Sequence, residues 1–344
     1  RSTRVALPVP VLSSDEEEDG EEQYEGEEGD FLQDWPDDTE DLELVHSRIS
    51  SLDELRLARF ASHLKRLCLR QNHISVLDAE VFRHLTKLEE LDLYDNKIKD
   101  PGHALDHLSN LSVLDLSFNL IRTIPDSLSR LTSLTTIYFV QNRISKITGL
   151  NYLTSLRSLE LGGNRIRKIE NLDALVNLEE LWLGKNKITK LENMSNMRKL
   201  KILSIQSNRI TMIEGLQELT NLEELYLSHN GVKRLEGLEK NVNLRTLDVG
   251  NNFISAIENV SHLIRLEELW ASQKPQTLYT SILIMSQMNG NQIPDLRALE
   301  LQLGHVSTLE TLYLEGNPCQ KNDASGYRRK IMLALKQLKQ IDAT

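Results

Sequence analysis

The chain has 344 residues and a formal net charge of −11, and residues 15–43 hold 17 acids with no Lys or Arg. From residue 44 onward there are 34 acidic and 38 basic residues, so a nearly neutral body follows an acidic segment. Two cysteines exclude a disulfide-stapled scaffold, and no run of 18 apolar residues predicts a membrane span. The charge distribution argues against a basic nucleic-acid-binding domain. We therefore expect neither nucleic acid nor a membrane as a partner.

The first predicted unit is an acidic disordered tail, residues 1–40. It combines few large apolar residues with a high net charge, so it cannot bury enough surface to fold. A tail that only solvates the protein is one interpretation, and a docking site for a basic partner is the other.

A repeated unit, L-x-x-L-x-L-x-x-N-x-I, follows the tail. Its asparagine recurs at spacings of 24, 23 and 23 residues, and then five times at 22. The asparagines are Asn72, Asn96, Asn119, Asn142, Asn164, Asn186, Asn208, Asn230, Asn252, Asn291 and Asn317. This regular recurrence is the leucine-rich-repeat signature. A degenerate copy at residues 42–49, with Ser47 in place of the asparagine, begins the series.

Each position of the repeat has a physical role. The two leucines of L-x-L point inward from a short strand, the residue between them faces outward, and successive strands stack in parallel. The buried asparagine satisfies backbone groups that the turn leaves unpaired. A 22-residue unit has no room for a long outer helix, so we expect short 3₁₀ turns on the convex side. The predicted fold is an α/β leucine-rich-repeat solenoid over residues 41–317, with about 12 repeats and a parallel concave sheet.

Residues 271–287 interrupt the period. Joining residue 270 to Met288 gives LEELWMNGNQI, which matches LEELWLGKNKI at residues 178–188. We expect these 17 extra residues to lie in mid-strand, to interrupt the sheet, and to leave Leu269 and Met288 in the inward positions. On that basis we expect the segment to lie outside the main functional product. A real loop that bulges from the sheet is the alternative.

Residues 318–344 are predicted to close the solenoid as a C-terminal cap. Residues 327–338, YRRKIMLALKQL, have apolar side chains at helical spacing and predict an amphipathic helix. Cys319 falls in a buried apolar position of the repeat, so we expect a structural thiol.

The outward positions of the predicted sheet carry the candidate site. The residues between the paired leucines are acidic and aromatic, and the residues two positions earlier add glutamates. Exposed Trp and Tyr side chains among carboxylates are typical of a surface that binds a partner with basic and apolar features. The alternative is that the aromatic residues only reflect strand propensity.

Catalytic motifs are missing from the sequence. The nine histidines show no metal-ligand spacing, and no G-K-[ST] follows Gly162 and Gly163 to form a phosphate loop. We therefore expect no catalytic residue, no cofactor, no metal and no enzymatic activity.

The repeat length, the phrases LDLYDNKI, LGKNKITKL and LYLSHNG, and the ending YRRKIMLAL resemble a known family over about residues 41–344. This family comprises the leucine-rich-repeat regulatory subunits of type-1 protein phosphatase. The resemblance implies a soluble, nuclear and cytoplasmic subunit that binds the phosphatase catalytic subunit through its concave face. It also implies effects on phosphatase maturation, localisation or activity, a role in chromosome segregation, and a separate inhibitor protein in the complex. We expect a monomer apart from its partner.

The family's contact positions carry over onto eight residues of this chain. Tyr138 and Trp182 stand where the family commonly has Phe, and the other six match its pattern. The predicted partner-binding residues are Asp115, Tyr138, Glu160, Trp182, Asp248, Glu268, Trp270 and Tyr313. Two alternatives remain open at this point. One is an acidic leucine-rich-repeat histone chaperone, in which the acidic tract would follow the repeats, and the other is a structural adaptor.

Overall fold

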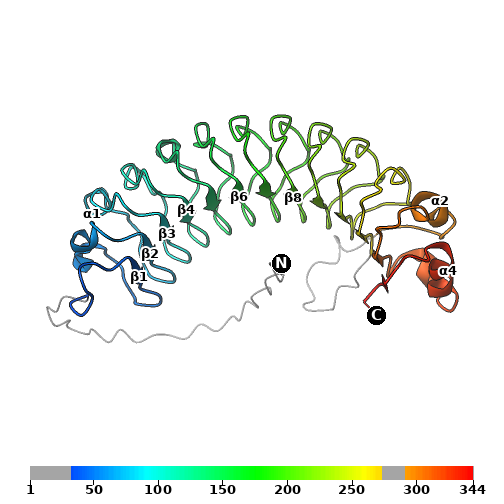
Figure 1. Cartoon of the computed structure of the whole chain (residues 1–344), viewed down its shortest axis with the longest axis horizontal. Coiled ribbons are helices and arrows are strands. Elements are labelled where there is room, and N and C mark those ends of the chain that lie inside the picture. Colours follow the sequence, from blue (N-terminus) through cyan, green and yellow to red (C-terminus); the bar gives the residue numbers. More distant parts are fainter. Residues whose placement is uncertain (1–31, 273–290, 344) are drawn as a thin grey trace.

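The computed structural model describes residues 32–272 and 291–343 of the chain. Its strands form one sheet of thirteen, in which every strand pairs in parallel with its neighbour in sequence. The chain winds as a solenoid bent into an arc, with the sheet on the inner side and the turns on the outer side (Figure 1). The predicted fold class is confirmed.

The strands are short and equivalent. Each of β2–β12 buries its middle residue, and in neighbouring strands these middle residues lie in register, as Leu159, Leu181 and Leu203 do. The strands are β1 (Asp41–Glu43), β2 (Arg66–Cys68), β3 (Glu90–Asp92), β4 (Val113–Asp115), β5 (Thr136–Tyr138), β6 (Ser158–Glu160), β7 (Glu180–Trp182), β8 (Ile202–Ser204), β9 (Glu224–Tyr226), β10 (Thr246–Asp248), β11 (Glu268–Trp270), β12 (Thr311–Tyr313) and β13 (Gln340–Ile341). Because the register never slips, one outward column runs along the whole inner surface.

The repeated asparagines form a ladder inside the solenoid. Asn164 Nδ2 donates to the carbonyl oxygens of Phe139 and Leu161, at 2.8 and 3.0 Å, and Asn164 Oδ1 accepts the Ile144 N–H at 3.0 Å. Wherever the structure describes the residue before a repeat asparagine, that residue has a positive φ, as Gly163 does at 70°. The turn exposes backbone groups to the apolar interior, and the amide side chain pairs them.

Short helical turns lie on the convex side and at the ends. The 3₁₀ helices are Asp53–Leu55, Leu57–Phe60 and Asp126–Arg130, and the α-helices are α1 (Ala79–Phe82), α2 (Leu299–Leu303), α3 (Pro318–Lys321) and α4 (Tyr327–Ala334). At one convex corner only glycine fits, because Gly215 has φ +70° and a Cβ there would lie 2.5 Å from the Leu191 carbonyl oxygen.

Residues before the predicted boundary at residue 40 pack on the solenoid. Leu32 is fully buried, and Trp35 packs against the hydrophobic core. Arg59 holds this segment by donating to the carbonyl oxygen of Trp35 at 2.6 Å and by pairing with Asp37 at 2.7 Å. Residues 32–40, assigned to the tail from the sequence, are therefore part of the N-terminal cap.

The C-terminal cap is confirmed, but its helix is shorter than predicted. The helix α4 ends at Ala334, because Leu335 leaves the helical conformation with φ −128° and ψ 78°. Gln337 then donates to the carbonyl oxygens of Leu303 and Val306, and the chain returns to pair with β12 as β13. Cys319 is buried, which raises the pKa of its thiol to about 11, as expected of a structural cysteine.

The predicted location of the extra residues is wrong. Leu269 points inward as expected, but the next inward position is filled by Ala271, which is fully buried. The Ala271 N–H donates to the Tyr313 carbonyl oxygen at 2.8 Å, and the Ser272 carbonyl oxygen accepts the Asn251 N–H at 2.9 Å. Strand β11 is therefore intact and pairs with both neighbours. Ala271 therefore occupies the inward position that we assigned to Met288, and Met288 itself lies outside the described residues.

The chain resumes the repeat at Asn291. Its Nδ2 donates to the carbonyl oxygens of Val249 and Ala271, and its Oδ1 accepts the Ile254 N–H at 2.9 Å. The extra residues thus fall between Ser272 and Asn291, after the end of the strand in the sequence. This removes the physical reason for placing them outside the functional product, since the sheet ladder is not interrupted.

Candidate functional site: the inner face of the sheet

The inner face presents two columns of outward side chains, because alternate residues of a strand point to opposite sides of a sheet. We call the third residues of β1–β12 the central column and the first residues of the same strands the leading column. The central column is Glu43, Cys68, Asp92, Asp115, Tyr138, Glu160, Trp182, Ser204, Tyr226, Asp248, Trp270 and Tyr313. Seven of the eight predicted binding residues lie in it, and Glu268 lies in the leading column.

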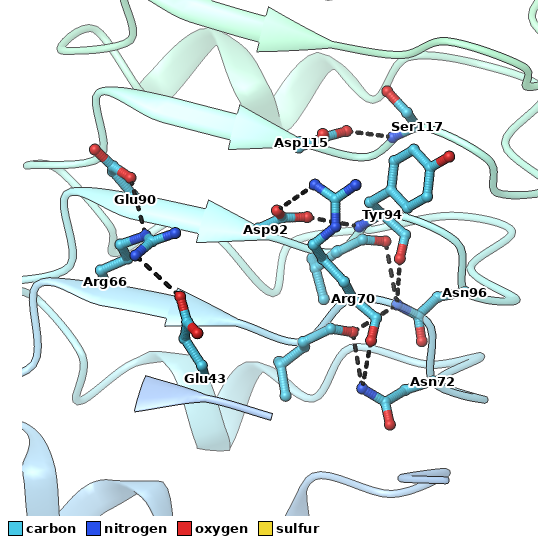
Figure 2. A network of polar contacts seen from close by, with 12 residues as sticks. Glu43, Arg66, Arg70, Asn72, Glu90, Asp92, Tyr94, Asn96, Asp115 and Ser117 are labelled. Atoms are coloured by element: carbon cyan, nitrogen blue, oxygen red, sulfur yellow. Dashed lines mark hydrogen bonds and ion pairs between the residues drawn. The ribbon is translucent and has the colours of Figure 1, made fainter. Parts of the chain in front are cut away.

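At the N-terminal end of this face the carboxylates pair with arginines of the same chain. Arg66 in the leading column contacts Asp41 at 3.0 Å. It also contacts Glu43 and Glu90, at 3.2 and 3.4 Å (Figure 2). An exposed arginine among three acids holds them in place and gives little stability. This part of the surface therefore stays acidic, but its carboxylates already have arginine partners within the chain.

A second arginine lies beside this cluster and combines three kinds of contact. The Arg70 guanidinium pairs with Asp92 at 2.9 Å and lies over the Tyr94 ring, 4.1 Å from its centroid (Figure 2). The Tyr94 ring in turn packs on Phe118, with centroids 4.8 Å apart. At this edge of the face, the Arg70 guanidinium thus has both an aromatic partner, Tyr94, and a carboxylate partner, Asp92.

Asp115 is the first predicted binding residue in chain order and is partly buried. Burial raises the pKa of its carboxyl, although the carboxylate accepts the Ser117 N–H at 2.8 Å. A carboxylate that loses water without gaining a full counter-charge is destabilised in the free protein. A cation from a partner would relieve this cost.

The C-terminal part of the face has acids and aromatic rings without bases. In the described strands β4–β12 the two columns hold six acids and no Lys or Arg. The acids are Asp115, Glu160, Glu180, Glu224, Asp248 and Glu268. Such a surface favours a basic partner by electrostatic complementarity.

Four aromatic side chains of this part form two ring pairs. Trp270 and Tyr313 lie on adjacent strands with ring centroids 4.9 Å apart, and Trp270 is 37% exposed. Trp182 pairs instead with Tyr226, two strands away, at 6.5 Å. Large rings with one face toward solvent are the side chains that anchor protein interfaces.

The structure brings the eight predicted residues onto one continuous surface from β4 to β12. Eight strand steps correspond to about 38 Å at about 4.8 Å per strand. Sequence reasoning left Tyr226, Glu180 and Glu224 out of the predicted site. The signal that could have found them is the segment E-L-W or E-L-Y, which recurs at residues 180–182, 224–226 and 268–270.

Other chemistries find no support in the part of the chain that the structure describes. No group of three or more His, Cys, Asp or Glu side chains is arranged to hold a metal ion there. In the same residues, no helix has the length and apolar character needed to cross a membrane. Cys68 in the central column is buried, and burial raises the pKa of its thiol.

The fold and this face define the class of protein. Two family models match the chain, one described as leucine-rich repeats in two copies over residues 154–196, 198–240 and 220–265, the other as leucine-rich repeat over residues 39–98, 62–108 and 99–144. The chain belongs to the leucine-rich-repeat proteins.

Named relatives match shorter stretches. The chain is 54% identical over 70 residues to protein phosphatase 1 regulatory subunit SDS22 of Saccharomyces cerevisiae, covering 20% of each chain. It is 56% identical over 43 residues to protein phosphatase 1 regulatory subunit 7 of Homo sapiens, covering 12% of this chain and 11% of the relative. The resemblance to this family of regulatory subunits is thus confirmed, although the match spans about a fifth of the yeast relative's length. These names and the repeat scaffold agree with a non-catalytic protein.

Solved structures with the same fold include an internalin from Listeria monocytogenes. It superposes with a TM-score of 0.65 at 24% identity, covering 89% of this chain and 87% of that chain. A leucine-rich-repeat protein of Leptospira interrogans gives a TM-score of 0.66 at 25% identity, covering 83% and 73% of the two chains. These likenesses establish the fold and carry no statement about partners.

Proposed function

We propose that this chain is a regulatory subunit that binds the catalytic subunit of type-1 protein phosphatase through the inner face of its sheet. The main support for this proposal is the continuous acidic and aromatic surface of β4–β12, which has six acids and no Lys or Arg in its two columns. The names of the relatives indicate which partner to test first.

The dimensions of the face support a single globular partner. A catalytic domain of about 300 residues has a radius of gyration of about 19 Å, and the predicted binding residues span about 38 Å. One such domain can contact both ends of the surface at once. On the basis of the resemblance, we also propose that an inhibitor protein joins the complex. We further propose that binding affects the maturation or localisation of the phosphatase.

The experiment is a calorimetric titration of the catalytic subunit with the full chain and its variants. Trp182→Ala and Trp270→Ala should each weaken binding by about 2 kcal/mol or more, roughly thirtyfold, as central aromatic anchors do. Tyr152→Ala is the matched control, since Tyr152 is 67% exposed in the turn that precedes β6, away from both columns.

The proposal fails if both tryptophan variants fold and bind like the wild type. It also fails if the full chain binds core histones as tightly as it binds the phosphatase, because the surface would then act as a general polyanion.

A further inference from the structure

Trp182 and Tyr226 approach each other across an intervening strand. They belong to β7 and β9, and the strand between them, β8, places Ser204 in the central column. Ser204 is short, its hydroxyl donates to Gln206, and it is only 1% exposed beneath the rings. The rings therefore lie 6.5 Å apart between centroids with their planes within 19°. Together they form a stacked pair of nearly parallel rings, which we call the aromatic platform.

Each ring is held by the carboxylate two residues earlier on its own strand. The Tyr226 hydroxyl donates to Glu224 at 2.7 Å, and the Trp182 indole N–H lies 3.5 Å from the Glu180 carboxylate. Burial and the Glu224 carboxylate raise the pKa of Tyr226, so its hydroxyl stays protonated and keeps donating. The platform is thus oriented before any partner arrives, with the Glu224 carboxyl group beside it.

The same sheet shows which group completes such an arrangement. At the N-terminal end, the Arg70 guanidinium stacks over the Tyr94 ring and pairs with Asp92 (Figure 2). At β7–β9 the ring and carboxylate components recur, but neither column of β4–β12 supplies an arginine. A planar guanidinium can stack on a ring and bond a carboxylate at once, whereas an ammonium group cannot do both as well.

We propose that Trp182, Tyr226 and Glu224 bind an arginine side chain of the partner, in the arrangement that Arg70 makes with Tyr94 and Asp92 within the chain. The identity of that partner rests on the proposed function, but the arginine site does not. Free arginine can therefore test the site independently of the phosphatase.

The first experiment follows the indole N–H signals of the full chain by ¹⁵N NMR. The sequence has three tryptophans, and Trp182→Phe assigns the relevant signal. N-acetyl-arginine methylamide should shift the Trp182 signal with a dissociation constant on the order of 10 mM. The lysine analogue at equal ionic strength should bind at least fivefold more weakly, and the Trp35 signal should not move.

Variants then test the named residues. Tyr226→Leu and Glu224→Gln should each weaken arginine binding at least fivefold. Glu223→Gln is the matched control, since it removes the same charge from the neighbouring residue, which pairs with Arg245 at 3.7 Å. Tyr226→Phe keeps the ring and loses only the hydroxyl that donates to Glu224. It should weaken arginine binding to an intermediate degree, which provides a test even if Tyr226→Leu fails to fold.

Phosphatase binding separates the two proposals. Tyr226→Leu should weaken it at least tenfold, and Glu223→Gln less than twofold. If arginine binds selectively at Trp182 but the wild-type chain does not bind the phosphatase, the arginine site stands and the proposed function fails. Equal shifts from arginine and lysine, or unchanged arginine binding in Glu224→Gln and both Tyr226 variants, would overturn the site whatever the phosphatase does.

Discussion

Replacing Asn252 by alanine tests the ladder that holds the repeats together. Asn252 is fully buried, its Nδ2 donates to the carbonyl oxygens of Leu227, Val249 and Gly250 at 3.0–3.1 Å, and its Oδ1 accepts the Val232 N–H at 3.0 Å. Alanine removes all four hydrogen bonds at once. The four lost bonds do not contribute equally to the loss of stability.

The three carbonyl oxygens keep other partners. The Leu227 oxygen also accepts from Asn230, the Val249 oxygen from Asn291, and the Gly250 oxygen from the His229 N–H. Of these four backbone groups, the Val232 N–H is the one that loses its partner. One orphaned buried donor costs about 1–3 kcal/mol, and each weakened acceptor costs about 0.5 kcal/mol or less. We therefore expect Asn252→Ala to lower the free energy of unfolding by about 3 kcal/mol.

Urea denaturation followed by circular dichroism and by tryptophan fluorescence measures this loss. Asn243→Ala is the control, because Asn243 donates to the Thr220 carbonyl oxygen at 2.8 Å on the exposed outer surface. It should cost less than about 1 kcal/mol. A loss below about 1 kcal/mol for Asn252→Ala, with coincident transitions, would refute the reasoning that buried turn N–H groups need this side chain.

Three further changes test other parts of the structure. Asn241→Leu should raise the free energy of unfolding by about 1 kcal/mol in urea titrations, because Asn241 is fully buried with an unpartnered Oδ1. In thermal melts, Gly215→Ala should cost about 2 kcal/mol or more, because its new Cβ would meet the Leu191 carbonyl oxygen, and Gly102→Ala, with open space around it, should cost less. Asp115→Asn should raise stability at pH 7 and lose that advantage below about pH 4. The raised pKa of Asp115 makes the folded wild type less stable as pH rises from the unfolded value of 3.8 through the folded value.

The periodic part of the structure was predictable because each repeat imposes the same local rule. Once the asparagines were aligned, the inward leucines and both outward columns followed from the alternation of strands. Periodicity alone placed seven of the predicted binding residues in the central column, whereas the resemblance to the phosphatase subunits selected them as contacts.

The incorrect predictions concern residues whose type departs from the repeat consensus or from the composition around them. Ala271 fills an inward position that leucine, isoleucine, valine or phenylalanine fills in the other repeats, so pattern matching preferred Met288. Leu32 and Trp35 lie among acids, and composition assigned them to the tail although they pack on the core. The Trp182–Tyr226 platform joins strands that are not adjacent and depends on a small residue between them, which no single repeat encodes.

The solenoid is continued by described residues on both sides of the interval between Ser272 and Asn291. Strand β11 completes its backbone bonds before this interval, and Asn291 resumes the ladder after it. The Trp270–Tyr313 ring pair, which bridges β11 and β12, has its centroids 4.9 Å apart. Evolution can therefore lengthen or shorten this interval while every residue that makes these contacts is kept.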